Sequence, residues 1–94
     1  MVVLCAMLWP REGKEQLLID YEDRVLELLP DHGARLLSRV RAIDGEPFEV
    51  QLLEFPSEGA LGAFTDDPRR AALASLRDQA IARTEVLRVS PIKD

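Results

Sequence analysis

Residues 34–55 read ARLLSRVRAIDGEPFEVQLLEF and predict a β-hairpin. Two extended runs, 34–43 and 47–55, flank the segment Asp44-Gly45-Glu46. An Asp-Gly pair between two extended runs is a strong hairpin signal, because both residues tolerate the backbone of a tight turn. We therefore expect the second and third strands of the fold to be adjacent and antiparallel.

The two faces of this hairpin differ in character when residue 43 is placed opposite residue 47. A mainly apolar face, expected to pack under helices, carries Leu36, Ser38, Val40, Phe48, Val50, Leu52 and Glu54. A mixed face carries Arg35, Leu37, Arg39, Arg41, Glu49, Gln51, Leu53 and Phe55, with Arg41 facing Glu49. A slip of one residue would move every side chain to the other face, so the pattern itself selects the register.

A strand and a helix are predicted before the hairpin. The apolar run Val2–Trp9, stopped by Pro10, is typical of a strand buried on both faces. Apolar residues then recur at three- and four-residue steps over residues 13–29, which predicts an amphipathic helix that Pro30 ends. Its acidic residues, Glu22 among them, are expected on the solvated side.

A broken helix and a last strand are predicted after the hairpin. Ser57 fits a helix N-cap, and Asp67 followed by Pro68 fits a second one, which predicts a break near residues 65–67 and a second piece to about residue 80. Residues 84–89 alternate as a strand. The order βαββαβ predicts an α+β, ferredoxin-like sandwich, with four antiparallel strands and helices on one face.

Length and composition exclude several classes of protein. The chain has 94 residues, of which 47% are hydrophobic and 31% charged, so we expect one ordered domain over residues 1–94. Its net charge of −5, without a basic cluster, argues against nucleic-acid binding. The apolar run at the start is too short to span a membrane and lacks the features of a signal peptide. With one cysteine and no export signal, we expect a cytoplasmic protein without a disulfide.

The sheet face away from the helices predicts a homodimer. On the expected register this face carries Leu37, Leu53 and Phe55 among charged residues. A monomer normally leaves no more than a few hundred Å² of apolar patch exposed. Two copies packed sheet to sheet would cover it, with a monomer that has a half-polar sheet surface as the alternative.

Four stretches carry a resemblance to a known family. They are Tyr21 in the first helix, HGARLL at 32–37, LEFPS at 53–57, and Asp67-Pro68-Arg69 before a helix that contains Arg77. In this order the chain resembles the dimeric α+β barrel superfamily and, within it, the bacterial domain-of-unknown-function family 1330. The resemblance implies a ferredoxin-like fold and a homodimer, and no agreed activity. The wider superfamily includes cofactor-independent monooxygenases, haem-degrading enzymes and small isomerases or lactonases.

Two residues are weak candidates for catalysis. His32 is the only histidine, and it precedes a strand at the rim of an expected cleft between sheet and helices. It is either a general base or hydrogen-bond donor for a small acid, or a turn histidine that lies in solvent or caps the C-terminal carbonyls of the first helix. Tyr21 either lines a small pocket with its polar tip or packs in the core with its O–H satisfied.

Candidate ligand-binding residues are Trp9, Tyr21, His32, Arg39 and Gln51. An arginine in the polar cluster of the hairpin either binds a carboxylate or serves a structural salt bridge, Arg41 with Glu49 being the expected pair. The chain has no Gly-rich phosphate loop, no Ser–His–Asp signature and no multi-His metal site, so we expect neither cofactor nor metal.

Two functions remain open from the sequence. The first is a homodimeric protein that binds a small molecule in a sheet–helix cleft without catalysis. The second is a cofactor-independent monooxygenase- or isomerase-like enzyme acting on a small aromatic or keto-acid substrate. A third possibility is a partner-binding module that uses the acidic first helix. A pocket reached by His32 together with Tyr21 or an arginine would favour the enzyme.

Overall fold

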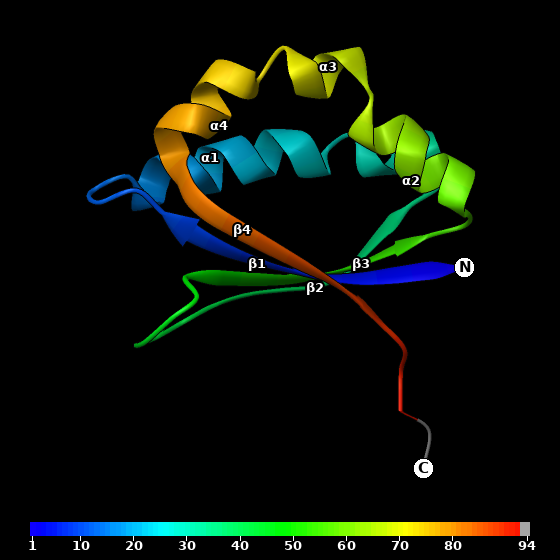
Figure 1. Ribbon diagram of the computed structural model, residues 1–94, viewed down its shortest axis with the longest axis horizontal. Coiled ribbons are helices and arrows are strands. Elements are labelled where there is room, and N and C mark those ends of the chain that lie inside the picture. Colours follow the sequence, from blue (N-terminus) through cyan, green and yellow to red (C-terminus); the bar gives the residue numbers. More distant parts are fainter. Residues whose placement is uncertain (93–94) are drawn as a thin grey trace.

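Four antiparallel strands form one sheet in the order β2-β3-β1-β4, and the helices lie on one side of it (Figure 1). The computed structural model describes residues 1–92. Its elements are β1 (Val2–Pro10), α1 (Glu15–Leu26), a short 3₁₀ turn η1 (Leu29–His32), β2 (Arg35–Arg41), β3 (Glu49–Phe55), α2 (Glu58–Thr65), α3 (Pro68–Ala71), α4 (Ala74–Ala80) and β4 (Ile81–Val89). The predicted ferredoxin-like βαββαβ order is confirmed.

The first helix ends earlier than its apolar pattern predicts. Helix α1 stops at Leu26, and η1 follows with Pro30 in its first turn, where a missing N–H is tolerated. Gly33 closes η1 in the left-handed conformation at φ 68°, and its N–H bonds back to the carbonyls of Leu29 and Pro30. The chain therefore turns into β2 with its backbone groups satisfied.

The second helical region is broken at two points, of which the sequence predicted one. Ser57 accepts a hydrogen bond from the Ala60 N–H at 3.1 Å and caps α2, as predicted. Asp67 accepts one from the Arg69 N–H at 2.9 Å and caps α3, with Pro68 at its first position. The further break between α3 and α4 was not predicted. Figure 1 shows that α2, α3 and α4 together arch over α1 and the sheet.

The hairpin register is confirmed over most of its length. Arg41 pairs with Glu49 and Val40 with Val50, as predicted. A register shift between Leu36 and Ser38 moves the rest of β2 by one residue. Such a bulge leaves one extra residue in one strand and increases the local twist, and no residue pattern in this segment predicts it.

The assignment of the hairpin faces from the sequence was wrong. Glu49, Gln51, Leu53 and Phe55 are buried against the helices, whereas Val40 is 55% exposed. In the central strand β1 the buried residues are Val2, Leu4, Ala6 and Leu8. The paired residues that remain lie on the opposite side, here called the open sheet face. Its apolar members are Val3, Cys5, Met7, Trp9, Val40, Val50, Leu52, Leu87 and Val89, and its polar members are Arg35, Ser38, Glu54, Arg83 and Glu85.

The core fills the layer between the sheet and α1. Leu18 and Phe55 are fully buried, and Tyr21, Val25 and Leu29 continue the buried stripe along α1 and η1. Within residues 1–92, no helix is long and apolar enough to cross a membrane.

Candidate functional site

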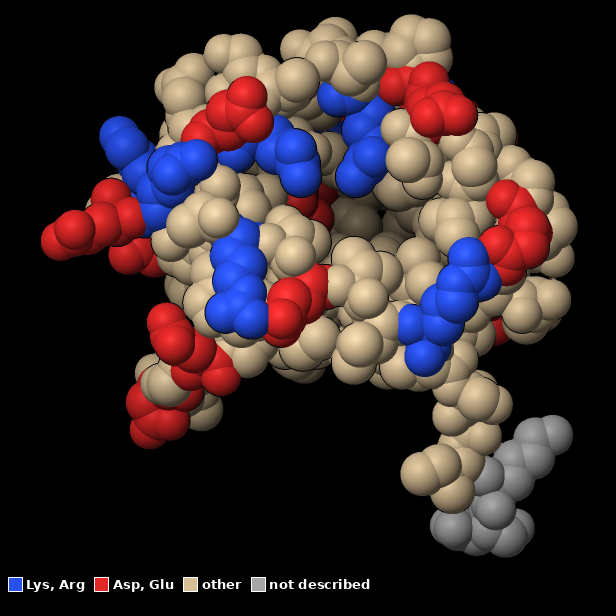
Figure 2. Space-filling view, in the orientation of Figure 1, with Lys and Arg blue, Asp and Glu red and all other residues tan. Residues whose placement is uncertain are grey.

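A cavity of about 360 Å³ lies between the sheet and the helical arch. Figure 2 shows this side of the molecule hollowed, with basic side chains along the helical rim and acidic atoms deeper inside. The apolar part of its lining is Leu4, Ala6, Leu8, Leu26, Leu53, Phe55, Leu61, Phe64, Ile81 and Val86. The polar part is Tyr21, Glu22, Gln51, Thr65, Arg70, Arg77, Thr84 and Arg88. A mainly apolar cavity with a few convergent polar groups is the usual form of a ligand site.

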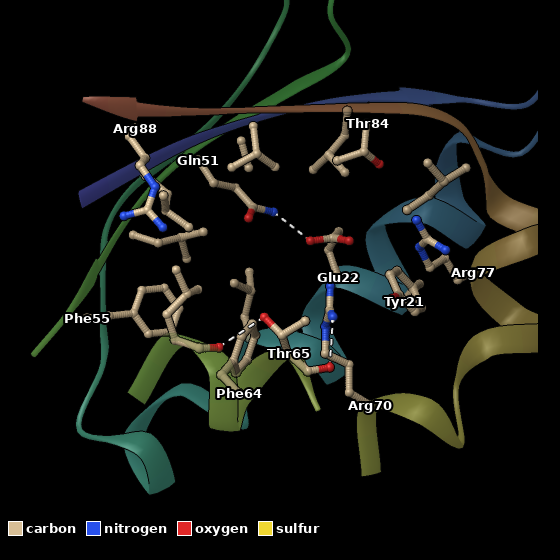
Figure 3. A pocket seen from close by; sticks show the side chains of 18 residues that line it. Tyr21, Glu22, Gln51, Phe55, Phe64, Thr65, Arg70, Arg77, Thr84 and Arg88 are labelled. Carbon is tan, nitrogen blue, oxygen red and sulfur yellow. Dashed lines mark hydrogen bonds between the residues drawn. The ribbon is translucent and has the colours of Figure 1, made fainter. Parts of the chain in front are cut away.

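Glu22 is a buried carboxylate in the wall of this cavity. It projects from α1, is only 6% exposed, and faces Gln51 of β3 across the interior (Figure 3). Burial raises the pKa of Glu22, and the neighbouring charge of Glu49 acts in the same direction, while the hydrogen bond from Gln51 opposes both. Its protonation is therefore easier than that of a surface glutamate.

Gln51 connects Glu22 to a second buried carboxylate. Its side-chain amide nitrogen donates to Glu22 Oε1 at 2.8 Å and to Glu49 Oε2 at 2.6 Å. Glu49 is fully buried and is neutralised by Arg39, at 2.9 Å, and by Arg41, at 3.0 Å. The predicted pair of Arg41 with Glu49 is thus present, but on the helix side of the sheet. Of the two carboxylates, only Glu22 lines the cavity.

Arg70 and Arg77 line the cavity from the helical arch. They also line a second hollow of about 240 Å³, together with Tyr21 and Thr65, so the two spaces share one wall. The guanidinium of Arg70 lies 5.3 Å from the centre of the Phe64 ring and donates to the Thr65 carbonyl at 3.3 Å. Its Nε is buried and bonds to no group of residues 1–92.

Tyr21 is almost completely buried beside these arginines. Burial raises the pKa of its phenol, and the charge of Arg70 acts in the opposite direction. The hydroxyl therefore keeps its proton at neutral pH and is available as a hydrogen-bond donor.

The structure brings together two of the five residues that the sequence suggested for ligand binding. Tyr21 and Gln51 line the cavity, and Trp9, His32 and Arg39 do not. Trp9 packs under the guanidinium of Arg83, 4.5 Å from its ring centre. Arg39 joins Glu49 to Asp23 of α1 through a contact of 2.6 Å to the latter.

His32 stabilises a junction between elements. Its Nε2 lies 2.8 Å from Asp67 Oδ2, and its ring packs edge-on against Phe64. Asp67 also accepts hydrogen bonds from Arg69, which together with His32 hold the pKa of that carboxyl well below its usual range. His32 therefore ties η1 to the start of α3, and it faces neither open solvent nor the cavity.

Glu22, Arg70 and Arg77 line the site but were not predicted from the sequence. Glu22 was expected on the solvated side of the first helix, and the structure instead places it, buried, in the cavity wall. The signal was present, because Glu22 follows Leu18 by four residues and precedes Val25 by three, the spacing of one helix face. For the arginines no local signal exists, because the arch that brings them to the cavity depends on the unpredicted break between α3 and α4. No group of three or more potential metal ligands is found in residues 1–92.

Comparison with solved structures places this fold among known proteins. A protein of unknown function from Rhodopseudomonas palustris matches with a TM-score of 0.79 at 16% identity, covering 99% of this chain and 83% of that one. An uncharacterised NIPSNAP domain protein from Burkholderia xenovorans matches with a TM-score of 0.77 at 18% identity, covering 98% of this chain and 95% of that one. A putative antibiotic biosynthesis monooxygenase from Nitrosomonas europaea matches with a TM-score of 0.80 at 8% identity, covering 99% of this chain and 100% of that one.

These similarities show the fold alone, because the sequence identities are low. The chain has the ferredoxin-like fold that these solved structures share. No protein-family model matches the chain, and no curated protein matches it. The narrower resemblance to family 1330 therefore stays a prediction.

Proposed function

We propose that this protein binds a small, mainly apolar organic molecule in the cavity between its sheet and its helices. The observation that carries the proposal is the buried Glu22–Gln51 pair in the wall of a mainly apolar space of about 360 Å³. This volume lies within the ~300–1,000 Å³ of ligand pockets. Burial of a polar group costs free energy unless the group is hydrogen-bonded. This favours a ligand that hydrogen-bonds to the polar groups of the cavity wall.

The binding unit is a homodimer that packs through the open sheet face. Support comes from the apolar character of that face, where Val40 and Leu87 are 55% and 54% exposed. The charged residues on the face are already paired, Arg35 with Glu54 at 2.8 Å and Arg83 with Glu85 at 2.6 Å. A second copy could therefore cover the apolar residues without burying an uncompensated charge. Fold-level similarity to dimeric α+β barrels adds support of a weaker kind.

An enzymatic role is the second candidate, of the cofactor-independent monooxygenase or isomerase type. The observation that favours it is Glu22, whose raised pKa and burial beside the cavity are typical of a group that exchanges protons. The putative monooxygenase among the structural matches is consistent with this role only at the level of the fold.

Titration of the protein with phenylacetone, a small neutral aromatic ketone, tests binding in the cavity. Methyl-labelled protein should show saturable NMR shifts at Leu53 and Leu61, which line the cavity, and none at Leu52 on the open sheet face. A Val86→Trp variant, which places an indole into the cavity from β4, should abolish these shifts. Equal shifts in the Val86→Trp protein would reject the proposal, as would the absence of saturable shifts with both phenylacetone and its carboxylate analogue phenylpyruvate.

A further inference from the structure

We propose that the cavity takes an organic carboxylate with an acidic C–H bond, that Arg70 and Arg77 bind its carboxylate, and that Glu22 removes the proton. This inference rests on the proposed function and names the ligand class and the chemistry of the same site. Its three residues come from α1, α3 and α4, and Figure 3 shows them around one space.

The placement of Glu22 suits a base. Its Oε1 is held by Gln51 at 2.8 Å, which fixes the orientation of the carboxylate. Within residues 1–92, the other oxygen accepts no side-chain hydrogen bond, and Figure 3 shows the carboxylate pointing into the cavity. A base must come within hydrogen-bond reach of the proton it takes, and this free oxygen is the group that can do so. The raised pKa of Glu22 makes it a better proton acceptor once it is ionised.

Arg70 and Arg77 are the cavity arginines without a carboxylate partner. Arg88, the third arginine of the lining, is bound by Glu58 at 2.8 Å. In the part of the chain that the structure describes, neither Arg70 nor Arg77 forms an ion pair, whereas Arg35, Arg39, Arg41, Arg69 and Arg83 all do. The buried Nε of Arg70 is likewise without a partner. Two guanidinium groups without a carboxylate partner at one cavity wall are suited to an anion, and a carboxylate matches their planar geometry.

The proximity of Arg70 to Glu22 limits where the acidic C–H of the ligand can lie relative to its carboxylate. The charges of Arg70 and Glu22 are close enough to influence each other, and Tyr21 lies beside both. We therefore expect the carbons nearest to a ligand carboxylate on Arg70 to lie closest to Glu22. A 2-keto acid fulfils this condition, because its acidic C–H is separated from the carboxylate by the keto carbon alone. Its apolar remainder would extend toward Leu53 and Phe55.

The chemical step is a proton transfer without change of oxidation state. The Glu22 carboxylate forms a bond to the proton, and the C–H electron pair becomes the second bond between the two carbons. The keto oxygen takes up the carbonyl electron pair as an enolate, which the guanidinium groups and the Tyr21 hydroxyl can stabilise as hydrogen-bond donors. Return of the proton from Glu22 to the oxygen gives the enol, and return to carbon restores the ketone. The step consumes no other reactant.

Phenylpyruvate and phenylacetone form a ligand pair that tests this assignment. Both carry a benzyl group next to a ketone, and only phenylpyruvate has a carboxylate. The wild-type protein should bind phenylpyruvate more tightly and should accelerate deuterium exchange at its benzylic carbon, by about 100-fold over buffer. Glu22→Gln should remove the acceleration and keep the phenylpyruvate Kd within about threefold, because the amide preserves shape and the contact with Gln51.

Arginine variants test the carboxylate contact separately. Arg70→Met and Arg77→Met should each weaken phenylpyruvate binding about tenfold and weaken phenylacetone binding much less. Arg24→Met is the matched control, since Arg24 is an exposed arginine of α1 that does not line the cavity. Circular dichroism of each variant excludes misfolding as the cause of a loss of binding or of deuterium exchange. Glu22→Asp, which keeps a carboxylate, serves as the conservative variant at position 22.

The outcomes separate the inference from the proposed function. If phenylacetone binds in the cavity as tightly as phenylpyruvate, or if Glu22→Gln exchanges as fast as wild type, the inference is wrong and cavity binding stands. If neither compound binds in the cavity, both the inference and the proposed function fail.

Discussion

The side-chain amide of Gln51 donates a hydrogen bond of 2.8 Å to the carboxylate of Glu22, which joins β3 to α1 inside the cavity. The same nitrogen donates to Glu49 at 2.6 Å, so one amide serves two buried carboxylates. Arg39 and Arg41 compensate the charge of Glu49, and no ion pair within residues 1–92 compensates that of Glu22. This asymmetry determines several properties of the protein that can be measured.

Replacement of Glu22 by glutamine should stabilise the protein at neutral pH. The pKa of Glu22 is raised in the folded protein, so the folded state binds its proton more tightly than the unfolded chain does. The wild type therefore loses stability as pH rises from the ordinary glutamate pKa through the raised one. Glu22→Gln lacks this loss and should gain about 1 kcal/mol at pH 7, within the usual range for a stabilising substitution. Urea unfolding of both proteins at pH 4 and pH 7 measures the effect. If Glu22→Gln gains more unfolding free energy over wild type at pH 4 than at pH 7, the raised pKa of Glu22 is contradicted.

Replacement of Gln51 by leucine should raise the pKa of Glu22 further. The hydrogen bond from Gln51 favours the ionised carboxylate, and leucine of similar size cannot donate one. Titration of the side-chain carboxyl carbon of Glu22 by ¹³C NMR gives the midpoint directly. Gln79→Leu, at an exposed glutamine of α4, is the control and should leave the midpoint unchanged. A midpoint that falls in Gln51→Leu would show that this hydrogen bond does not act on the ionised form.

Removal of the Asp67 side chain should destabilise the junction of α2 and α3. Asp67 caps α3 through the Arg69 N–H and binds both His32 and the Arg69 guanidinium. Asp67→Ala loses all three contacts, and we expect the thermal midpoint to fall by about 5 °C or more. Asp66→Ala changes the adjacent exposed aspartate and should have a small effect. Equal midpoints for the two variants would show that the cap and the His32 contact contribute nothing.

Variants at two neighbouring residues of β4 test the dimer interface and the cavity independently. Val86 and Leu87 are equally exposed at 54%, but Val86 lines the cavity and Leu87 lies on the open sheet face. Leu87→Asp should dissociate the proposed homodimer, because it places a charge in the apolar interface. Val86→Asp should remain dimeric and lose phenylacetone binding. Sedimentation equilibrium measures the masses. A wild-type mass of one chain, or a dimeric Leu87→Asp protein, would exclude this interface.

The sequence predicted the order of elements better than the direction of the side chains. Hairpin, caps and register follow from local chemistry, since Asp44-Gly45, Ser57 and Asp67 each favour one backbone conformation. Which hairpin face is buried depends on whether the surrounding elements provide hydrogen-bonding partners for its polar side chains. Glu49 and Gln51 were predicted on the sheet face away from the helices, yet Arg39 and Glu22 provide partners that make their burial under the helices possible.

The candidate site was predictable only in part, for the same physical reason. Tyr21 and Gln51 could be named from residue type, and both line the cavity. His32 was named for its chemistry, but its neighbour Asp67 is 35 residues away in sequence and engages it elsewhere. Arg70 and Arg77 reach the cavity because the helical segment bends twice, and only the first bend, at Asp67-Pro68, follows from a short-range pattern.

A crystal structure of the protein soaked with phenylpyruvate tests the central claim most directly. The account predicts density in the cavity, with the carboxylate on Arg70 or Arg77 and the benzylic carbon next to Glu22. An empty cavity at saturating phenylpyruvate, or density only outside it, would contradict the claim that this space is the binding site.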